Sequence, residues 1–93
     1  MQSKERAQLR AIAHNTETTL QAGKSGITEN LCIQLENELT ARQLVKGAVL
    51  ETAPVTAREA AAALAEKANA EIVQVIGRRF VLYRRNPEKP PLL

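Results

Sequence analysis

Residues 72–84 read IVQVIGRRFVLYR and contain the two clearest strands of the chain. β-Branched and aromatic residues dominate the runs 72–76 (IVQVI) and 79–84 (RFVLYR), as is typical of strands. Gly77 and Arg78 separate the runs, and a two-residue spacer that begins with glycine favours a tight hairpin turn. The segment therefore predicts an antiparallel pair of strands near the end of the chain.

Upstream of this hairpin, helical and strand-like segments alternate. Helices are expected at residues 3–14, at 29–42 and from 56 to about 68, and strands at 18–22 and 44–50. Ser3 and Thr28 are suitable N-caps for the first two helices, and Thr56 with Glu59 three residues later forms a capping box for the third. Gly47 interrupts its strand, which indicates a bulge or a close approach of another part of the chain.

The resulting order, α-β-α-β-α-β-β, predicts the fold class. Strands that are separated by helices need crossover connections, which favour parallel neighbours, and the final hairpin adds an antiparallel pair. We expect an α/β fold with a mixed four-stranded sheet packed by helices. Residues 1–86 should form a single domain, and the proline-rich tail 87–93 should be extended and mobile.

Composition limits the classes of function. The chain has 93 residues, of which 44% are apolar, but Phe80 and Tyr83 are its two aromatic residues. The core must therefore be aliphatic, and a binding mode that stacks many bases on aromatic rings is disfavoured. Cys32 is the single cysteine, so no intrachain disulfide can form. The chain shows no apolar signal segment or run long enough to span a bilayer, so we expect a cytoplasmic protein with no membrane partner.

Positive charge lies toward the two ends of the chain. The net charge is +2 over residues 1–27 and +4 over residues 72–93, whereas it is −2 over residues 28–43 and −1 over residues 44–71. If the fold brings the two ends together, they form one basic face suited to phosphate.

A loop of sequence Gly23-Lys24-Ser25-Gly26 lies between the first predicted strand and the helix that Thr28 begins. Glycine permits positive φ and a close approach of a ligand to the main chain, and a helix N-terminus presents N–H groups that favour an anion. The same arrangement clamps nucleic-acid backbone in KH domains. Two glycines at this spacing also occur in ordinary turns, so the motif alone leaves both interpretations open.

No set of residues indicates catalysis or metal binding. The chain has no aspartate, His14 has no second histidine nearby in sequence, and Cys32 lies on the apolar side of its helix. His14 near a helix C-terminus is better explained by a favourable interaction with the helix dipole. We therefore expect a protein that is not an enzyme and has no catalytic residues, metal, cofactor or small-molecule substrate.

Three segments together resemble a known family. They are KERAQLR at residues 4–10, AGKSGITE at residues 22–29 and VQVIGRRFVLYR at residues 73–84. In order and spacing they resemble the YhbY-like family, the bacterial stand-alone form of the CRM (chloroplast RNA splicing and ribosome maturation) domain. The resemblance extends over residues 3–85. It implies a fold similar to the C-terminal domain of translation initiation factor three, binding to RNA, and association with precursors of the large ribosomal subunit.

The expected RNA contacts combine this resemblance with the placement of charge. They are the loop residues, the basic residues of the first helix and arginines near the C-terminal hairpin: Gly23, Lys24, Ser25, Gly26, Lys4, Arg6, Arg10, Arg78 and Arg84. Strand alternation prevents all the C-terminal arginines from facing one surface. Other hypotheses remain open at this point, namely another structured RNA (transfer RNA or an intron) or a protein-interaction module in which the acidic second and third helices contact a partner.

Overall fold

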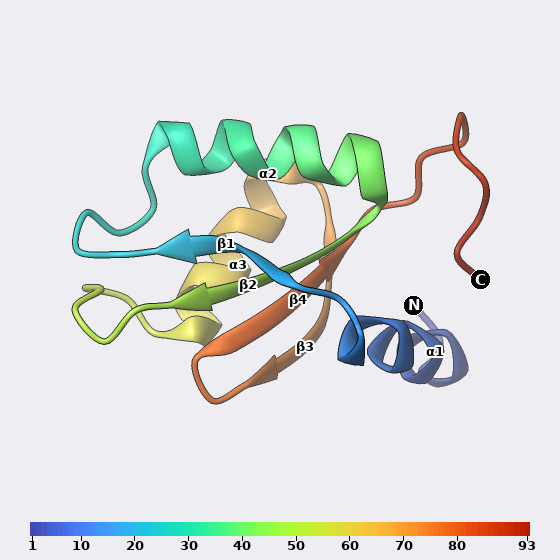
Figure 1. Ribbon diagram of the computed structural model, residues 1–93, viewed down its shortest axis with the longest axis horizontal. Coiled ribbons are helices and arrows are strands. Elements are labelled where there is room, and N and C mark those ends of the chain that lie inside the picture. Colours follow the sequence, from blue (N-terminus) through green and yellow to red (C-terminus); the bar gives the residue numbers. More distant parts are fainter.

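The computed structural model describes all residues, 1–93, and its element order matches the prediction. Three helices alternate with four strands, and the last two strands form the hairpin (Figure 1). The helices are α1 (Ser3–His14), α2 (Glu29–Arg42) and α3 (Ala57–Ala68), and the strands are β1 (Thr18–Ala22), β2 (Leu44–Val49), β3 (Glu71–Ile76) and β4 (Arg79–Tyr83).

The strands form one mixed sheet in the order β1-β2-β4-β3. β1 and β2 are parallel, whereas β4 pairs antiparallel with both β2 and β3. The parallel pair is connected through α2, as a crossover connection requires, and Gly77 adopts a φ of 58° in the hairpin turn. The predicted α/β fold with a mixed four-stranded sheet is therefore confirmed.

The two faces of the sheet are covered differently. α2 and α3 pack on one face, which we call the closed face, and bury a cluster of 15 residues that includes Leu35, Leu64 and Phe80. α1 packs on one end of the opposite face, which we call the open face, over a cluster of five buried residues that includes Leu9 and Val81. The other end of the open face lies beside the loops 23–28 and 50–56 (Figure 1).

The helices begin close to the residues predicted from the sequence. The Thr28 hydroxyl accepts a hydrogen bond from the N–H of Leu31, and Thr56 and Glu59 form the predicted capping box. α1 differs, because its N-cap is Gln2 rather than Ser3, and Glu5 completes a capping box with it. The cap of α1 thus lies one residue before the predicted position.

Gly47 marks a close approach, as one of the two interpretations of its strand position predicted. A Cβ atom on Gly47 would lie 2.4 Å from Cζ of Phe80, so the aromatic ring occupies the space that a side chain would need.

The next residue toward the N-terminus, Lys46, lies in the interior of the sheet and not at an edge, because β2 is flanked by β1 and β4.

Residues after β4 fold back onto the domain. Gln43, which has a φ of 68°, donates from Nε2 to the Pro90 carbonyl at 2.9 Å, and its Oε1 accepts from the N–H of Asn86 at 2.9 Å. Leu92 packs against the five-residue cluster beneath α1. The tail thus makes specific contacts with the rest of the domain.

Candidate nucleic-acid interface

The loop between β1 and α2 is a compact turn with an exposed tip. The N–H of Gly26 donates to the carbonyl of Gly23 at 2.9 Å, and Gly26 has a φ of 70°, a value that glycine adopts without strain. Lys24 and Ser25 at the tip are exposed. A shallow hollow of about 350 Å³ lies beside them, between the loop and the first turns of α2, and Gln21, Asn30 and Gln34 also line it. Polar groups therefore surround the tip of the loop.

The neighbouring loop 50–56 supports this turn from behind. A Cβ on Gly23 would lie 3.4 Å from Cδ1 of Leu50, and one on Gly26 would lie 3.2 Å from Cγ of Pro54. The N–H of Leu50 also donates to the carbonyl of Ala22 at 2.8 Å. The two loops consequently hold each other at one end of the sheet, with the Lys24 side chain exposed.

A larger groove lies between α1 and the open face. Its volume is about 570 Å³, and its charged or ionisable lining residues are Arg10, His14, Lys46 and Arg79. Lys46 Nζ donates to the carbonyl of Ala13 at 3.1 Å and so caps the last turn of α1. No carboxylate lines the groove, which makes it an electropositive site.

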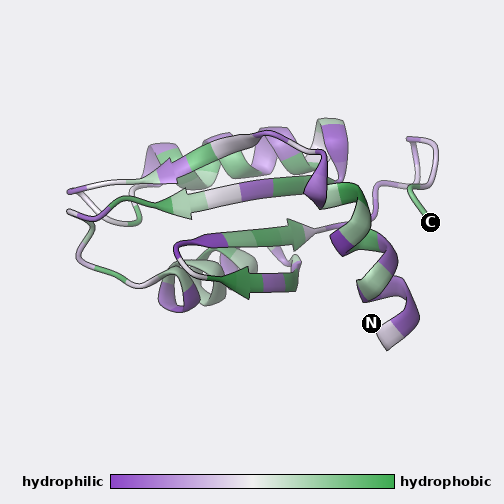
Figure 2. Cartoon of the chain, turned by 60° about the horizontal axis from the view of Figure 1, so that its bottom comes forward, coloured by the Kyte–Doolittle hydropathy of each residue, from purple (hydrophilic) through white to green (hydrophobic).

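A third hollow connects the groove to the loop. Its volume is about 660 Å³, and it shares Ile76 and Arg79 with the α1 groove and Gln21 with the loop hollow. In Figure 2, hydrophobic residues follow the strands, whereas hydrophilic ones interrupt β2 and β3 and lie at the tips of the loops that follow β1 and β2. The three hollows therefore form one surface that runs from α1 across the open face to Lys24, which we call the basic surface.

The predicted basic residues differ in their relation to this surface. Arg10 lines the groove, whereas Lys4 and Arg6 are exposed on α1 outside it. Arg78 lines the third hollow, and its guanidinium lies 3.9 Å from a carboxylate oxygen of Glu51, with both side chains largely exposed. The basic surface thus brings together Lys24, Arg10 and Arg78 of the predicted set.

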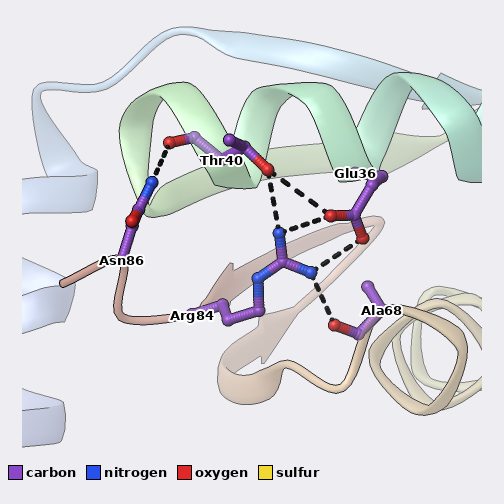
Figure 3. Close-up of polar contacts among 5 residues, drawn as sticks. All are labelled: Glu36, Thr40, Ala68, Arg84 and Asn86. Atoms are coloured by element: carbon purple, nitrogen blue, oxygen red, sulfur yellow. Dashed lines mark hydrogen bonds and ion pairs between the residues drawn. The ribbon is translucent and has the colours of Figure 1, made fainter. Parts of the chain in front are cut away.

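Arg84 occupies a different place. Its guanidinium donates to both carboxylate oxygens of Glu36 at 2.8 and 2.7 Å, to the carbonyl of Ala68 at 2.8 Å and to Thr40 at 3.1 Å (Figure 3). The hydrogen bond with Arg84 lowers the pKa of Glu36, and the same bond raises the pKa of Arg84. This bidentate pair joins α2, α3 and the end of β4, so Arg84 has a structural role on the closed side of the sheet.

Sequence reasoning weighed Arg79 as one of four weaker candidates among the C-terminal arginines and did not assign Lys46 or Gln74 to the site. All three line the groove, in neighbouring strands of the sheet. Alternation in β2 and β4 gives the parity of Lys46 and Arg79, but the strand order that brings them together is not visible in a single sequence. Gln74 is harder to find, because the register of β3 shifts between Ile72 and Gln74 and changes the face to which later residues belong.

Two further observations concern other classes of site. No cluster of three His, Cys, Asp or Glu side chains could hold a metal ion, and Cys32 is partly buried against the core of the closed face. None of the three helices combines the length and the apolar character needed to cross a membrane.

Relatives of known description share this sequence and fold. The probable RNA-binding protein YqeI of Bacillus subtilis is 34% identical over 85 residues, which cover 91% of this chain and 88% of that protein. An RNA-binding protein of Haemophilus influenzae is 30% identical over 95% of this chain and 89% of its own length.

A solved structure has the same architecture. The solution structure of a hypothetical protein from Staphylococcus aureus, described as a candidate RNA-binding protein, superposes with a TM-score of 0.81. The two sequences are 38% identical, and the match covers 97% of this chain and 94% of the other. The model of the CRS1/YhbY (CRM) domain matches residues 1–84, which include α1, the Gly23–Gly26 loop and the whole sheet. The chain therefore belongs to the CRS1/YhbY (CRM) domain family.

Proposed function

We propose that this protein binds structured RNA and that the basic surface contacts the phosphate backbone. In this proposal Lys24 and the main chain of the loop contact one stretch of backbone, and Arg10 and Arg79 contact another across the open face. The protein acts as a binding protein and not as an enzyme. The descriptions of its relatives as RNA-binding proteins support the class of ligand.

The observation that carries the proposal is the absence of carboxylates from the groove beneath α1. Arg10 and Arg79 line it without an acidic neighbour, and the three ion pairs of the chain involve other residues. Cations that are not neutralised within the protein attract polyanions and release condensed counterions when they bind RNA. Binding should therefore weaken steeply as the salt concentration rises.

The acidic residues of α2 and α3 offer less to a protein partner than their number suggests. Glu36 pairs with Arg84, Glu38 accepts hydrogen bonds from Thr19 and Gln34, and Glu59 caps α3. These carboxylates contribute to the fold. The RNA hypothesis is accordingly preferred over a protein-interaction module.

As the biological ligand we propose precursors of the large ribosomal subunit in the cytoplasm, with transfer RNA or an intron as the alternative ligands. Crosslinking in cells followed by sequencing of the bound RNA tests this choice. Enrichment of large-subunit ribosomal RNA is the expected result, and enrichment of another RNA class would replace the assignment while leaving RNA binding in place.

The contact residues are tested by a charge reversal on the basic surface. The double variant Lys24→Glu/Arg10→Glu should lose about 100-fold in affinity for fragments of large-subunit ribosomal RNA at moderate salt, and its salt dependence should be shallower. The matched control is Arg58→Glu/Lys67→Glu, which makes the same charge change on exposed positions of α3. Equal losses in the two double variants, measured by fluorescence anisotropy, would contradict the proposed surface.

A further inference from the structure

The groove beneath α1 has features that contact with a phosphate backbone does not require. Six of its eleven lining residues are hydrophobic, and they include Ala7 and Ala11 of α1 and Ile76 and Val81 of the sheet. Its volume of about 570 Å³ is typical of sites that enclose small organic groups. Of the hydrophobic residues, Ala7, Ala11 and Ile76 are exposed and form an apolar wall that contact with a phosphate does not require.

Three polar side chains of the groove make no hydrogen bond or ion pair within the protein. The side chains of Gln74, Arg10 and Arg79 take part in none of the side-chain hydrogen bonds or ion pairs of the fold, in contrast to Lys46, which caps α1. Gln74 is half-buried and lies in the same groove as the two arginines. The groove therefore combines an apolar wall, one amide that can both donate and accept, and two guanidinium groups.

A nucleotide has the chemistry that fits this combination. Its base is flat and largely apolar on its faces, its edge carries donors and acceptors, and its phosphates are anionic. We infer that the groove receives one unpaired nucleotide of a bound RNA, with the base against the apolar wall, the Gln74 amide at the base edge and the phosphates near Arg10 and Arg79. The inference rests on the proposed function, because the nucleotide belongs to the RNA that the basic surface binds.

The preferred base follows from the amide. A glutamine side chain pairs bidentately with N6 and N7 of adenine, and unpaired bases in RNA present that edge to proteins. The basic surface has no aromatic platform for a base, because Phe80 is only 1% exposed and Tyr83 lines a different pocket. The apolar wall of the groove offers a base an alternative surface to pack against. Gln74 is thus a specificity-determining residue for adenine.

Three RNA hairpins that differ at one position test the subsite. The first carries a single bulged adenosine in its stem, the second carries an abasic residue at that position, and the third is fully paired. The wild-type protein should bind the first about tenfold more tightly than the other two. Adenosine monophosphate alone should compete only at much higher concentration, because it lacks the remaining backbone contacts; competition at the affinity of the hairpin would identify a free-nucleotide site and overturn the inference.

Two variants act on the groove alone. Ala11→Phe fills it from an exposed position of α1 without a change of charge, and Gln74→Ala removes the amide. Both should remove the roughly tenfold preference for the bulged hairpin over the paired hairpin. Ala62→Phe, on an exposed position of α3, is the control and should change neither affinity. Thermal melts establish that each variant is folded, and the NMR signals of the Gln74 side-chain amide should move only with the bulged RNA.

The failure of the subsite and the failure of the proposed function give different results. Equal wild-type affinity for the bulged and abasic hairpins, or equal losses for all three hairpins in Ala11→Phe, would overturn the subsite while RNA binding stands. Lys24→Glu should lower the affinity for all three hairpins by a common factor. No binding of wild-type protein to any hairpin would reject the proposed function and the subsite together.

Discussion

The closed and open faces of the sheet differ in the number of residues that they bury and in the pairing of their arginines. The closed face, beneath α2 and α3, buries 15 residues in one cluster, whereas the open face buries five beneath α1. On the closed side Arg84 is paired with Glu36, whereas Arg10 and Arg79 on the open side face a groove without carboxylates. The closed face therefore holds most of the buried core, and the open face exposes arginines that no carboxylate neutralises.

The largest expected effect comes from weakening the closed face. Leu64 and Leu9 are both fully buried leucines, one in each cluster. Leu64→Ala should lower the free energy of unfolding by about 4 kcal/mol, because α2, α3 and the sheet surround the cavity and cannot close it. Leu9→Ala should lower it by about 2–3 kcal/mol, because α1 is held by a smaller cluster and can settle into the space.

Urea unfolding of both variants measures this contrast. RNA affinity, corrected for the folded fraction, should be unchanged in Leu64→Ala and reduced in Leu9→Ala, since movement of α1 alters the groove. A larger loss of stability in Leu9→Ala than in Leu64→Ala would show that the division of roles between the faces is wrong.

The second prediction separates a structural arginine from the basic surface. Arg84→Met should lower the free energy of unfolding by about 1–2 kcal/mol, because it removes a bidentate partner of Glu36 and leaves the carbonyl of Ala68 without its hydrogen bond. The affinity for RNA should stay within twofold of wild type. Arg58→Met, at an exposed position of α3, is the control and should change stability by less than about 0.5 kcal/mol. A large loss of RNA affinity in Arg84→Met would return Arg84 to the binding surface.

Arg84 also illustrates what the sequence could and could not predict. Local signals located the helices, the strands and the caps at Thr28 and Thr56, because these depend on residues that lie close together in the chain. The partner of Arg84 is 48 residues away, and the strand ends at Tyr83, so strand alternation does not determine where this side chain points. Local chemistry and family resemblance predicted the loop and Arg10 as RNA contacts and named Arg79 as a weaker candidate. The placement of Arg79 and Gln74 in one groove required the strand order and the register shift in β3.

The third prediction concerns pH and the same ion pair. The pKa of Glu36 is lowered in the folded protein by its hydrogen bond to Arg84. Its stabilising contribution is therefore complete above the ordinary pKa of glutamate, about 4.3, and is lost as the pH falls through the lower folded-state value. Since the Glu36 side chain is 54% exposed, we expect only about 0.5–1 kcal/mol from this source. The difference in melting temperature between wild type and Glu36→Gln should be largest near pH 6 and should shrink as the pH falls below about 4.3. A difference that is independent of pH would assign the stabilisation to the neutral hydrogen bonds.

The smallest expected effect sharpens the description of the open side. Glu51 lies 3.9 Å from Arg78 at the edge of the third hollow and is the one carboxylate among its lining residues. It competes with phosphate for the arginine and repels the backbone of a bound RNA, so Glu51→Gln should raise the affinity for RNA by about twofold and make the dependence on salt slightly steeper. Glu66→Gln, at an exposed position of α3, adds the same charge on the opposite side and should have no effect. Fluorescence anisotropy at two salt concentrations measures the RNA affinity of both variants. An equal rise in both would mean that net charge, and not the local position of Glu51, limits binding. The basic surface would then extend no further than the groove and the loop.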